Sequence, residues 1–217
     1  MLPLEHRLQS MLAAKVATVI RADSAEIALS AADALIAAGF RLIEITMTVP
    51  GAVEAIQELC RKINAADQSD IVVGAGTVMS AADARRCIEA GAAFVVSPTC
   101  ETDIIRPCRE SGVVAIPAGL TPTEIVQAWR SGAHFVKVFP AGSLGGPAYV
   151  KALRGPLPDI PLWVSGMVTA KEASAYFQAG AQLVGLGSEL LPTHLLAAKD
   201  WAAVTEHAQQ LRVLCLG

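Results

Sequence analysis

One lysine, Lys137, stands inside a short run of apolar and β-branched residues. The run 135–138 predicts a buried strand, because turn-forming residues stand on both sides of it. A buried, unpaired ammonium group costs several kcal/mol, so lysine is seldom found at such a position without a reason. Burial also lowers the pKa of an amine and frees it to attack a carbonyl carbon. A lysine paired with a carboxylate, or facing solvent on an edge strand, is the structural alternative.

A glutamate, Glu44, stands within another strand-like run at 42–45. If the chain forms a barrel of parallel strands, Glu44 and Lys137 reach one mouth, because the carboxyl ends of such strands converge. The other residues predicted at strand ends are Arg21, Thr46, Thr48, Thr77, Pro98, Pro117, Phe139, Ser165, Gly166, Gly187 and Ser188. An amine and a carboxylate in one mouth suit carbonyl chemistry through a Schiff base. A simple salt bridge is the alternative, although buried ion pairs stabilise proteins weakly.

The ends of the last two predicted strands, with the loops that follow them, are rich in glycine and serine. They read Ser165-Gly166-Met167-Val168-Thr169 and Gly185-Leu186-Gly187-Ser188. In barrels, loops at these positions and the helix N-terminus that follows them form a phosphate site. We therefore predict that Ser165, Gly166, Met167, Gly187 and Ser188 bind phosphate, with ordinary turns as the alternative. Arg21, after the first strand, suits a carboxylate or phosphate, and equally a solvated surface position.

Composition predicts a single folded domain over residues 1–217. Of the 217 residues, 53% are hydrophobic and 17% are charged, which provides for one large core and gives no sign of disorder. The formal net charge of −3, with no cluster of basic residues, argues against nucleic acid as a partner. The five cysteines form no C-x-x-C pair, which indicates reduced thiols and a cytoplasmic location.

Other classes of protein are disfavoured by what the chain does not contain. No run approaches the roughly 18 apolar residues of a membrane helix, and charged residues near the N-terminus interrupt any signal-peptide core. The four histidines do not have the placement of ligands, and Glu44 is the one carboxylate among the predicted strand ends. We therefore expect no metal and no cofactor.

Eight short apolar stretches predict strands, each followed by a helical stretch. The predicted strands are 16–20, 42–45, 71–73, 94–96, 113–116, 135–138, 162–164 and 183–186. The predicted helices are a short one ending at 11–15, then 24–38, 51–63, 80–90, 101–111, one opened by a capping box at 121–124, 145–153, 169–179 and 195–211. This repeat predicts a (β/α)8 barrel. A doubly wound open sheet is the alternative, but Gly74-Ala75-Gly76-Thr77-Val78 lacks the third glycine of a dinucleotide-binding motif.

Seven segments together carry a family resemblance. They are Ile43-Glu44-Ile45-Thr46, Val73-Gly74-Ala75-Gly76-Thr77-Val78, Val96-Ser97-Pro98, Pro122-Thr123-Glu124, Val136-Lys137-Val138-Phe139-Pro140, 146–156 and Gly185-Leu186-Gly187-Ser188. In order and spacing, over nearly the whole chain, they resemble the 2-keto-3-deoxy-6-phosphogluconate aldolases, also called 4-hydroxy-2-oxoglutarate aldolases. The resemblance implies a metal-free class I aldolase on a (β/α)8 barrel, a homotrimer in the cytoplasm. Its substrate would be a 2-keto-3-deoxy sugar acid, cleaved to pyruvate and an aldehyde.

The same resemblance implies a role for individual residues. Lys137 would be the Schiff-base lysine and Glu44 the general acid/base. Thr77 would contact the pyruvoyl part of the substrate, with Pro98 and Phe139 lining the site. Ser165, Gly166 and Ser188 would hold the phosphate. A phosphosugar isomerase or epimerase, or a non-catalytic barrel that binds a phosphate ligand, are the competing functions.

Three positions depart from the family pattern. Thr48 stands where many members carry arginine. How the substrate's anionic end is held is therefore open, and Arg21 and Thr48 are the residues predicted to bind it. Ala118 replaces a usual glycine, and Met167 replaces the second glycine of a Thr-Gly-Gly-Val phosphate motif. A side chain at Met167 is expected to crowd the phosphate or turn its N–H away, and so to weaken the preference for a phosphorylated substrate. The alternative is that Met167 points outward and its N–H still binds phosphate.

Overall fold

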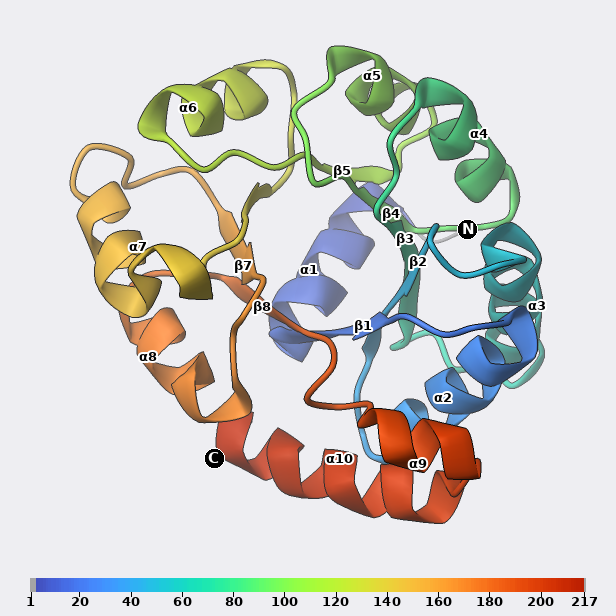
Figure 1. The fold of residues 1–217 in the computed structure, drawn as a ribbon. Helices are drawn as coiled ribbons and strands as arrows, with labels where there is room; N and C mark the ends of the chain where they lie inside the picture. The colour runs from blue at the N-terminus through green and yellow to red at the C-terminus, as the bar shows by residue number, and fades with distance from the viewer. Residues whose placement is uncertain (1–2, 217) are drawn as a thin grey trace.

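The computed structural model describes residues 3–216 and contains a sheet of eight parallel strands curled into a barrel (Figure 1). The strands are β1 (Val16–Ile20), β2 (Leu42–Thr46), β3 (Val72–Gly76), β4 (Phe94–Val96), β5 (Val114–Ile116), β6 (Val136–Val138), β7 (Leu162–Ser165) and β8 (Leu183–Leu186). Their hydrogen-bonded order is β5-β4-β3-β2-β1-β8-β7-β6. All eight predicted strands are therefore present, although β3 continues to Gly76 where the prediction ended at Val73.

The two ends of this sheet meet just after β5. Ala118 forms an isolated parallel bridge with Lys137. The Lys137 N–H donates to the Pro117 carbonyl over 2.8 Å, and the Gly119 N–H donates to the Lys137 carbonyl over 2.9 Å. The (β/α)8 prediction is confirmed and the open-sheet alternative is wrong, because these backbone bonds join the strands that an open sheet would leave as edges.

Helices surround the strands, most of them in a ring (Figure 1). They are α1 (Leu4–Ala14), α2 (Ala25–Ala37), α3 (Ala52–Ala65), α4 (Ala81–Glu89), α5 (Thr102–Glu110), α6 (Pro122–Arg130), α7 (Gly146–Arg154), α8 (Ala173–Gln178), α9 (Thr193–Ala198) and α10 (Trp201–Leu216), with 3-10 turns η1 (Gly142–Leu144) and η2 (Ala170–Glu172). The predicted capping box opens α6, where Thr121 and Glu124 each accept the other's backbone N–H. Across residues 3–216, no helix combines the length and apolar character that a membrane span requires.

The prediction of one last helix at 195–211 is wrong, because α9 and α10 are separate helices. Lys199 ends α9 in the left-handed conformation, with φ of 52°. Asp200 then starts α10, since its carboxylate accepts the Ala203 N–H over 3.0 Å in the manner of an N-cap. Aspartate is a common N-cap residue, but the apolar periodicity continues on both sides of Asp200 and so predicted one uninterrupted helix.

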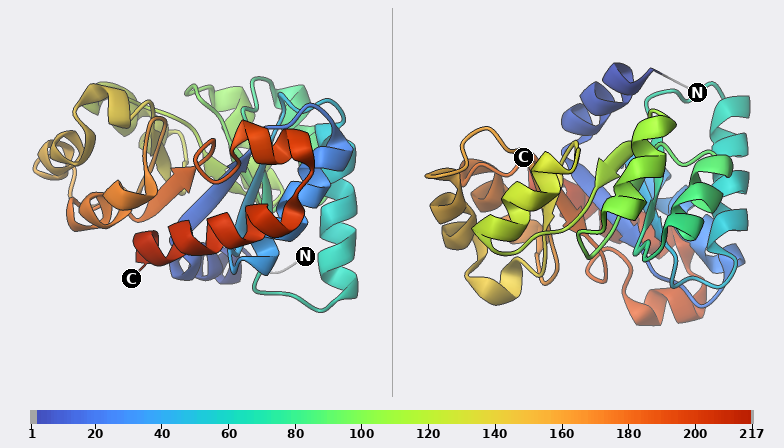
Figure 2. Two further views of the ribbon diagram at one scale, coloured as in Figure 1. Left: turned by 60° about the horizontal axis from the view of Figure 1, so that its bottom comes forward. Right: turned by 90° about the horizontal axis from the view of Figure 1, so that it is seen from above.

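The protein has two hydrophobic cores, one on each side of the sheet. The outer core lies between the strands and the ring of helices. The inner core fills the barrel and includes Phe94, Phe135 and Trp163, with the Phe94 and Trp163 ring centroids 5.8 Å apart. Met11 of α1 belongs to this inner core, and Figure 2 shows α1 standing at one end of the barrel, apart from the ring. The N-terminal helix therefore closes the amino-terminal end of the barrel.

Candidate active site

Lys137 points into the barrel from the middle of β6. Its neighbours Val136 and Val138 belong to the outer core, and successive strand residues face opposite sides of a sheet. The lysine is only 4% exposed. Burial lowers the pKa of Lys137, an effect that the charge of Glu44 opposes and the charge of Arg21 reinforces. A lowered pKa increases the share of neutral amine, which is the nucleophilic form.

Glu44 points into the same interior from β2, since Ile43 and Ile45 both belong to the outer core. The residue is fully buried. Burial raises the pKa of Glu44, while the charges of Lys137 and Arg21 act in the opposite direction. Gly76 on the neighbouring strand makes room for the carboxylate, because a Cβ at that position would lie 1.8 Å from Glu44 Oε1. The glycine pattern 74–76, which on sequence resembled a partial nucleotide motif, is thus a packing requirement here.

Glu44 and Lys137 influence one another without forming a salt bridge. Within residues 3–216, neither Glu44 oxygen accepts a hydrogen bond. The Lys137 Nζ instead lies 4.9 Å from the centre of the Phe139 ring. The face of an aromatic ring attracts a nearby ammonium group electrostatically, without a hydrogen bond or an ion pair. Neither group is therefore tied up in an ion pair with the other, and of the two only Lys137 lines the cavity at the mouth, since Glu44 lies fully buried behind it.

The predicted phosphate loops line one cavity together with Lys137. The cavity has a volume of about 230 Å³, and its lining includes Arg21, Lys137, Phe139, Ser165, Gly166, Met167, Gly187 and Ser188. Among the hydrogen bonds of residues 3–216, none uses the backbone N–H of Gly166, Met167, Gly187 or Ser188. Unpaired N–H groups from two adjacent loops are the donors that an anion requires. Eight of the residues predicted from sequence are thus brought to one place.

Met167 does not fill this cavity with its side chain. The residue is 78% exposed, and its backbone adopts φ of 56°, the left-handed region usually taken by glycine. Gly166 before it has φ of 84°, and a Cβ there would lie 2.7 Å from the Phe139 ring. The chain therefore keeps the backbone path of a two-glycine loop, and the expectation that Met167 crowds the cradle is not supported by its position.

Arg21 also lines a second cavity, of about 420 Å³, which Thr48 shares. The Thr48 hydroxyl lies 2.7 Å from the Thr46 hydroxyl, and the Thr46 hydroxyl donates to the Ile20 carbonyl over 3.1 Å. Arg21 therefore stands between the two hollows, and its charge acts on both Glu44 and Lys137. This places a fixed positive charge at the mouth of the barrel.

Thr77 and Pro98 follow the carboxyl ends of β3 and β4. Thr77 has φ of 55°, an uncommon conformation for a β-branched residue, which directs the chain sharply out of β3. Pro98 stands between Ser97 and Thr99, whose hydroxyls lie 3.1 Å apart. Neither Thr77 nor Pro98 is among the described residues that line the cavity beside Lys137, so their roles toward a substrate stay predictions.

Two residues that shape the cavity, Glu189 and Gly185, are not among the site residues predicted from the sequence. The Glu189 carboxylate accepts the Ala170 N–H over 2.7 Å and so ties the loop after β8 to the loop after β7. Gly185 leaves space for Trp163 and Ser165, since a Cβ there would lie 2.8 Å from Trp163 Nε1 and 3.0 Å from the Ser165 Cβ. The acidic residue directly after Ser188 was a visible signal for the first. For the second, nothing in the sequence indicated which side chain the glycine accommodates.

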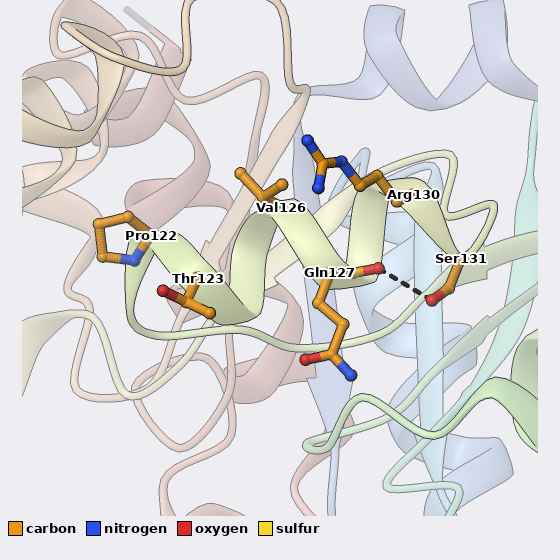
Figure 3. Close-up of a pocket in the computed structure, with 6 residues that line it drawn as sticks. All are labelled: Pro122, Thr123, Val126, Gln127, Arg130 and Ser131. Carbon is orange, nitrogen blue, oxygen red and sulfur yellow. Dashed lines mark hydrogen bonds between the residues drawn. The ribbon is translucent and has the colours of Figure 1, made fainter.

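A wider hollow of about 530 Å³ runs along the outer face of α6 (Figure 3). Its lining consists of Pro122, Thr123, Val126, Gln127, Arg130 and Ser131. All six belong to one helix and its C-cap, and the hydrogen bond drawn among them is the ordinary one from the Ser131 hydroxyl to the Gln127 carbonyl, 2.8 Å long. No groups from separate elements converge there, so we place the chemistry at Lys137.

A parallel barrel with a buried amine and a buried carboxylate toward its carboxyl-terminal mouth has the construction of an enzyme of carbonyl chemistry. Comparison with known proteins gives the family. The family described as KDPG and KHG aldolase matches residues 8–207. These abbreviations denote the 2-keto-3-deoxy-6-phosphogluconate and 4-hydroxy-2-oxoglutarate substrates of the sequence resemblance.

Individual relatives agree with this match. A 2-dehydro-3-deoxy-phosphogluconate aldolase of Pseudomonas aeruginosa is 34% identical over 88% of this chain and 84% of its own length. A probable 2-dehydro-3-deoxy-6-phosphogalactonate aldolase of Rhizobium meliloti is 35% identical over 72% of each chain. The crystal structure of KDPG aldolase from Legionella pneumophila, with pyruvate captured as a covalent carbinolamine, has a TM-score of 0.84 at 27% identity, covering 94% of this chain and 97% of that one. The chain belongs to the KDPG and KHG aldolase family and is a class I aldolase, a carbon–carbon lyase.

Proposed function

We propose that Lys137 is the Schiff-base lysine and Glu44 the general acid/base in the cleavage of a 2-keto-3-deoxy sugar acid. The substrates that we infer are 2-keto-3-deoxy-6-phosphogluconate and 4-hydroxy-2-oxoglutarate, and the aldehyde products are glyceraldehyde 3-phosphate and glyoxylate. One observation carries the proposal. Lys137 and Glu44 are both buried in one barrel interior, their charges act on each other, and Glu44 accepts no hydrogen bond within residues 3–216.

The steps follow from the two groups. The neutral Lys137 amine attacks the C2 carbonyl to form a carbinolamine, which takes up a proton and loses water to give an iminium ion. The ionised Glu44 carboxylate, through a water, removes the proton of the C4 hydroxyl. The C3–C4 bond then breaks, its electrons pass into the iminium to form an enamine, and the aldehyde leaves. Protonation of the enamine carbon and hydrolysis of the imine release pyruvate and restore the amine.

The remaining predicted residues would hold the substrate. We assign the pyruvoyl end to Thr77, Pro98 and Phe139, where the ring beside the Lys137 Nζ also favours the iminium charge. The unpaired N–H groups of the loops after β7 and β8 support a phosphate site at residues 165–167 and 187–188. Arg21 and Thr48 at the mouth are assigned to the substrate's anionic groups.

We further propose that the enzyme is a homotrimer in the cytoplasm. The family resemblance supports the trimer, and the five cysteines, all free thiols in the structure, fit a reducing compartment. Light scattering after size-exclusion chromatography gives the mass of the assembly. A mass of about three chains supports the proposal, and a monomer contradicts it.

Trapping with pyruvate and borohydride tests the chemistry directly. Reduction of the imine leaves an irreversible adduct on one lysine, which peptide mass spectrometry locates. We expect the adduct on Lys137 and on neither Lys151 nor Lys171, which serve as internal controls. An isomerase or epimerase, or a barrel that only binds phosphate, would give no adduct. An adduct mapped to another lysine would overturn the assignment of Lys137.

A further inference from the structure

A second, half-open and mainly apolar cavity lies under α1, at the amino-terminal end of the barrel. A cavity of about 250 Å³ is lined by Arg7 of α1, by Cys60, Ile63 and Asn64 of α3, and by residues 71–73 at the start of β3. The strand ends that carry the proposed chemistry lie at the other end of the barrel. The cavity therefore belongs to neither the substrate site nor its phosphate loops.

Arg7 makes this cavity unusual. The residue is only 5% exposed, and within residues 3–216 the one hydrogen bond of its side chain runs from Nη1 to the Gly112 carbonyl, 2.8 Å long. Nε is buried and has no partner there, and no described carboxylate forms an ion pair with the side chain. A guanidinium group stays charged even where burial lowers its pKa, and an uncompensated buried charge is strongly unfavourable. The arrangement is one that an anion would complete.

The free edge of the guanidinium specifies the kind of anion. Nη1 is occupied by Gly112, which leaves Nε and Nη2 side by side, and this edge matches the two oxygens of a carboxylate. The facing walls are mainly apolar, with Ile63, Ile71 and Val72 among them. A single positive charge beside apolar walls suits a monovalent anion with a short alkyl part better than a phosphate dianion.

We propose that this cavity binds a small aliphatic carboxylate. Its oxygens accept hydrogen bonds from Nε and Nη2 of Arg7, and its alkyl part packs on Ile63, Ile71 and Val72. The proposal does not depend on the reaction at Lys137. It adds to the enzyme a carboxylate site that is separated from the substrate site by the inner core of the barrel.

Butyrate is the probe, because it has the carboxylate and the alkyl chain but no carbonyl that could form an imine. Titration calorimetry of the full-length protein measures its affinity in the wild type and in Arg7→Gln. Arg106→Gln is the matched control, since Arg106 is 68% exposed on α5 and away from the cavity. Lys137→Ala serves as a second control, which reports any butyrate bound at the active site. Methyl NMR adds the location, through contacts from the butyrate methyl group to Ile63 and Ile71.

We expect saturable binding that Arg7→Gln weakens at least tenfold, the loss expected for a charge-assisted hydrogen bond. Arg106→Gln and Lys137→Ala should bind butyrate with the wild-type affinity. Arg7→Lys keeps the positive charge but loses the two parallel N–H donors of the guanidinium, so it should bind butyrate more weakly than the wild type. Absence of binding, equal binding to Arg7→Gln, or loss of binding in Lys137→Ala overturns the proposal. Arg7-dependent binding of inorganic phosphate with no binding of butyrate overturns the carboxylate assignment.

Discussion

The two halves of the barrel interior hold opposite kinds of side chain. Toward the amino-terminal ends of the strands, Phe94, Phe135 and Trp163 pack with Met11 of α1 in an apolar core. One layer further along, Glu44 and Lys137 are buried just as deeply but carry ionisable groups that form no ion pair with each other. Burial of the aromatic half thus stabilises the fold, whereas burial of the two ionisable side chains in the other half destabilises it.

This division explains how an unpaired amine and carboxylate persist in the interior. Burial of aromatic rings offsets the unfavourable desolvation of Glu44 and Lys137, and the barrel closes around both layers through the backbone bonds at Pro117 and Gly119. Substitutions in the two halves should therefore have different consequences. Changes in the charged layer should affect turnover, and changes in the aromatic layer should affect stability.

The largest effect is expected for Lys137→Ala. Cleavage and the borohydride-trapped pyruvate adduct should both be abolished, because within residues 3–216 Lys137 is the one lysine that lines this cavity. The fold should remain, since the change removes a buried ionisable group that forms no ion pair. Aldol cleavage assays and circular dichroism measure the two properties, with Lys151→Ala as the control. Residual cleavage near the wild-type rate would show that both layers are structural.

Glu44→Gln should lower kcat by about 10²- to 10⁴-fold, the usual loss for a general acid/base. Glutamine keeps the shape of the side chain, so the variant should still capture pyruvate on Lys137 under borohydride. Single-turnover kinetics and adduct trapping in parallel separate the two steps. Cleavage near the wild-type rate would make Glu44 a structural residue and remove it from the mechanism.

Phe94→Ala tests the aromatic layer. Truncating a buried phenylalanine typically costs about 3–5 kcal/mol of unfolding free energy, and Phe94 packs against Trp163 and over Gly74. Chemical denaturation measures the loss, and kcat per folded molecule should stay near the wild type. A large fall in kcat with unchanged stability would contradict the division between the two layers.

The pH dependence of adduct formation should report the lowered pKa of Lys137. Only the neutral amine reacts, so the rate should fall about tenfold per pH unit below that pKa. Between the lowered pKa and the ordinary value of 10.5, the unfolded chain binds more protons, so this residue makes stability rise with pH. Denaturation of wild type and Lys137→Met across this window checks the sign. An equal slope in both proteins would contradict it.

Met167→Gly should have the smallest effect. The exposed side chain leaves the cavity open, and the loop already follows a left-handed path, so the preference between phosphorylated and unphosphorylated substrates should change little. Glycine would relieve backbone strain in the folded protein, which stabilises it by about 1 kcal/mol. It would also increase the conformational freedom of the unfolded chain, which destabilises the folded state by about 1 kcal/mol, so the two effects on stability oppose one another. Measurements of kcat/KM for both substrates decide the matter. A several-fold rise in the preference for the phosphorylated substrate would restore the crowding hypothesis.

Much of this protein could be predicted from its sequence, because the signals involved are local. Alternating helical and strand-like segments predicted eight strands and the barrel, and the position of Lys137 and Glu44 within apolar runs predicted that both side chains would be buried. The glycine- and serine-rich segments after β7 and β8 predicted loops that do line one cavity. Each of these inferences depends on residues close together in the chain and on a general property of parallel barrels.

Only the tertiary structure decided how distant positions fit one another. The space that Gly76 leaves for Glu44, the unpaired state of the carboxylate and the tie between Glu189 and Ala170 all join separate strands or loops. The burial of Arg7 beneath the barrel and the break between α9 and α10 likewise depend on packing that periodicity does not describe. Sequence periodicity records which face of an element is buried, whereas the partner buried against it is fixed by the closure of the barrel.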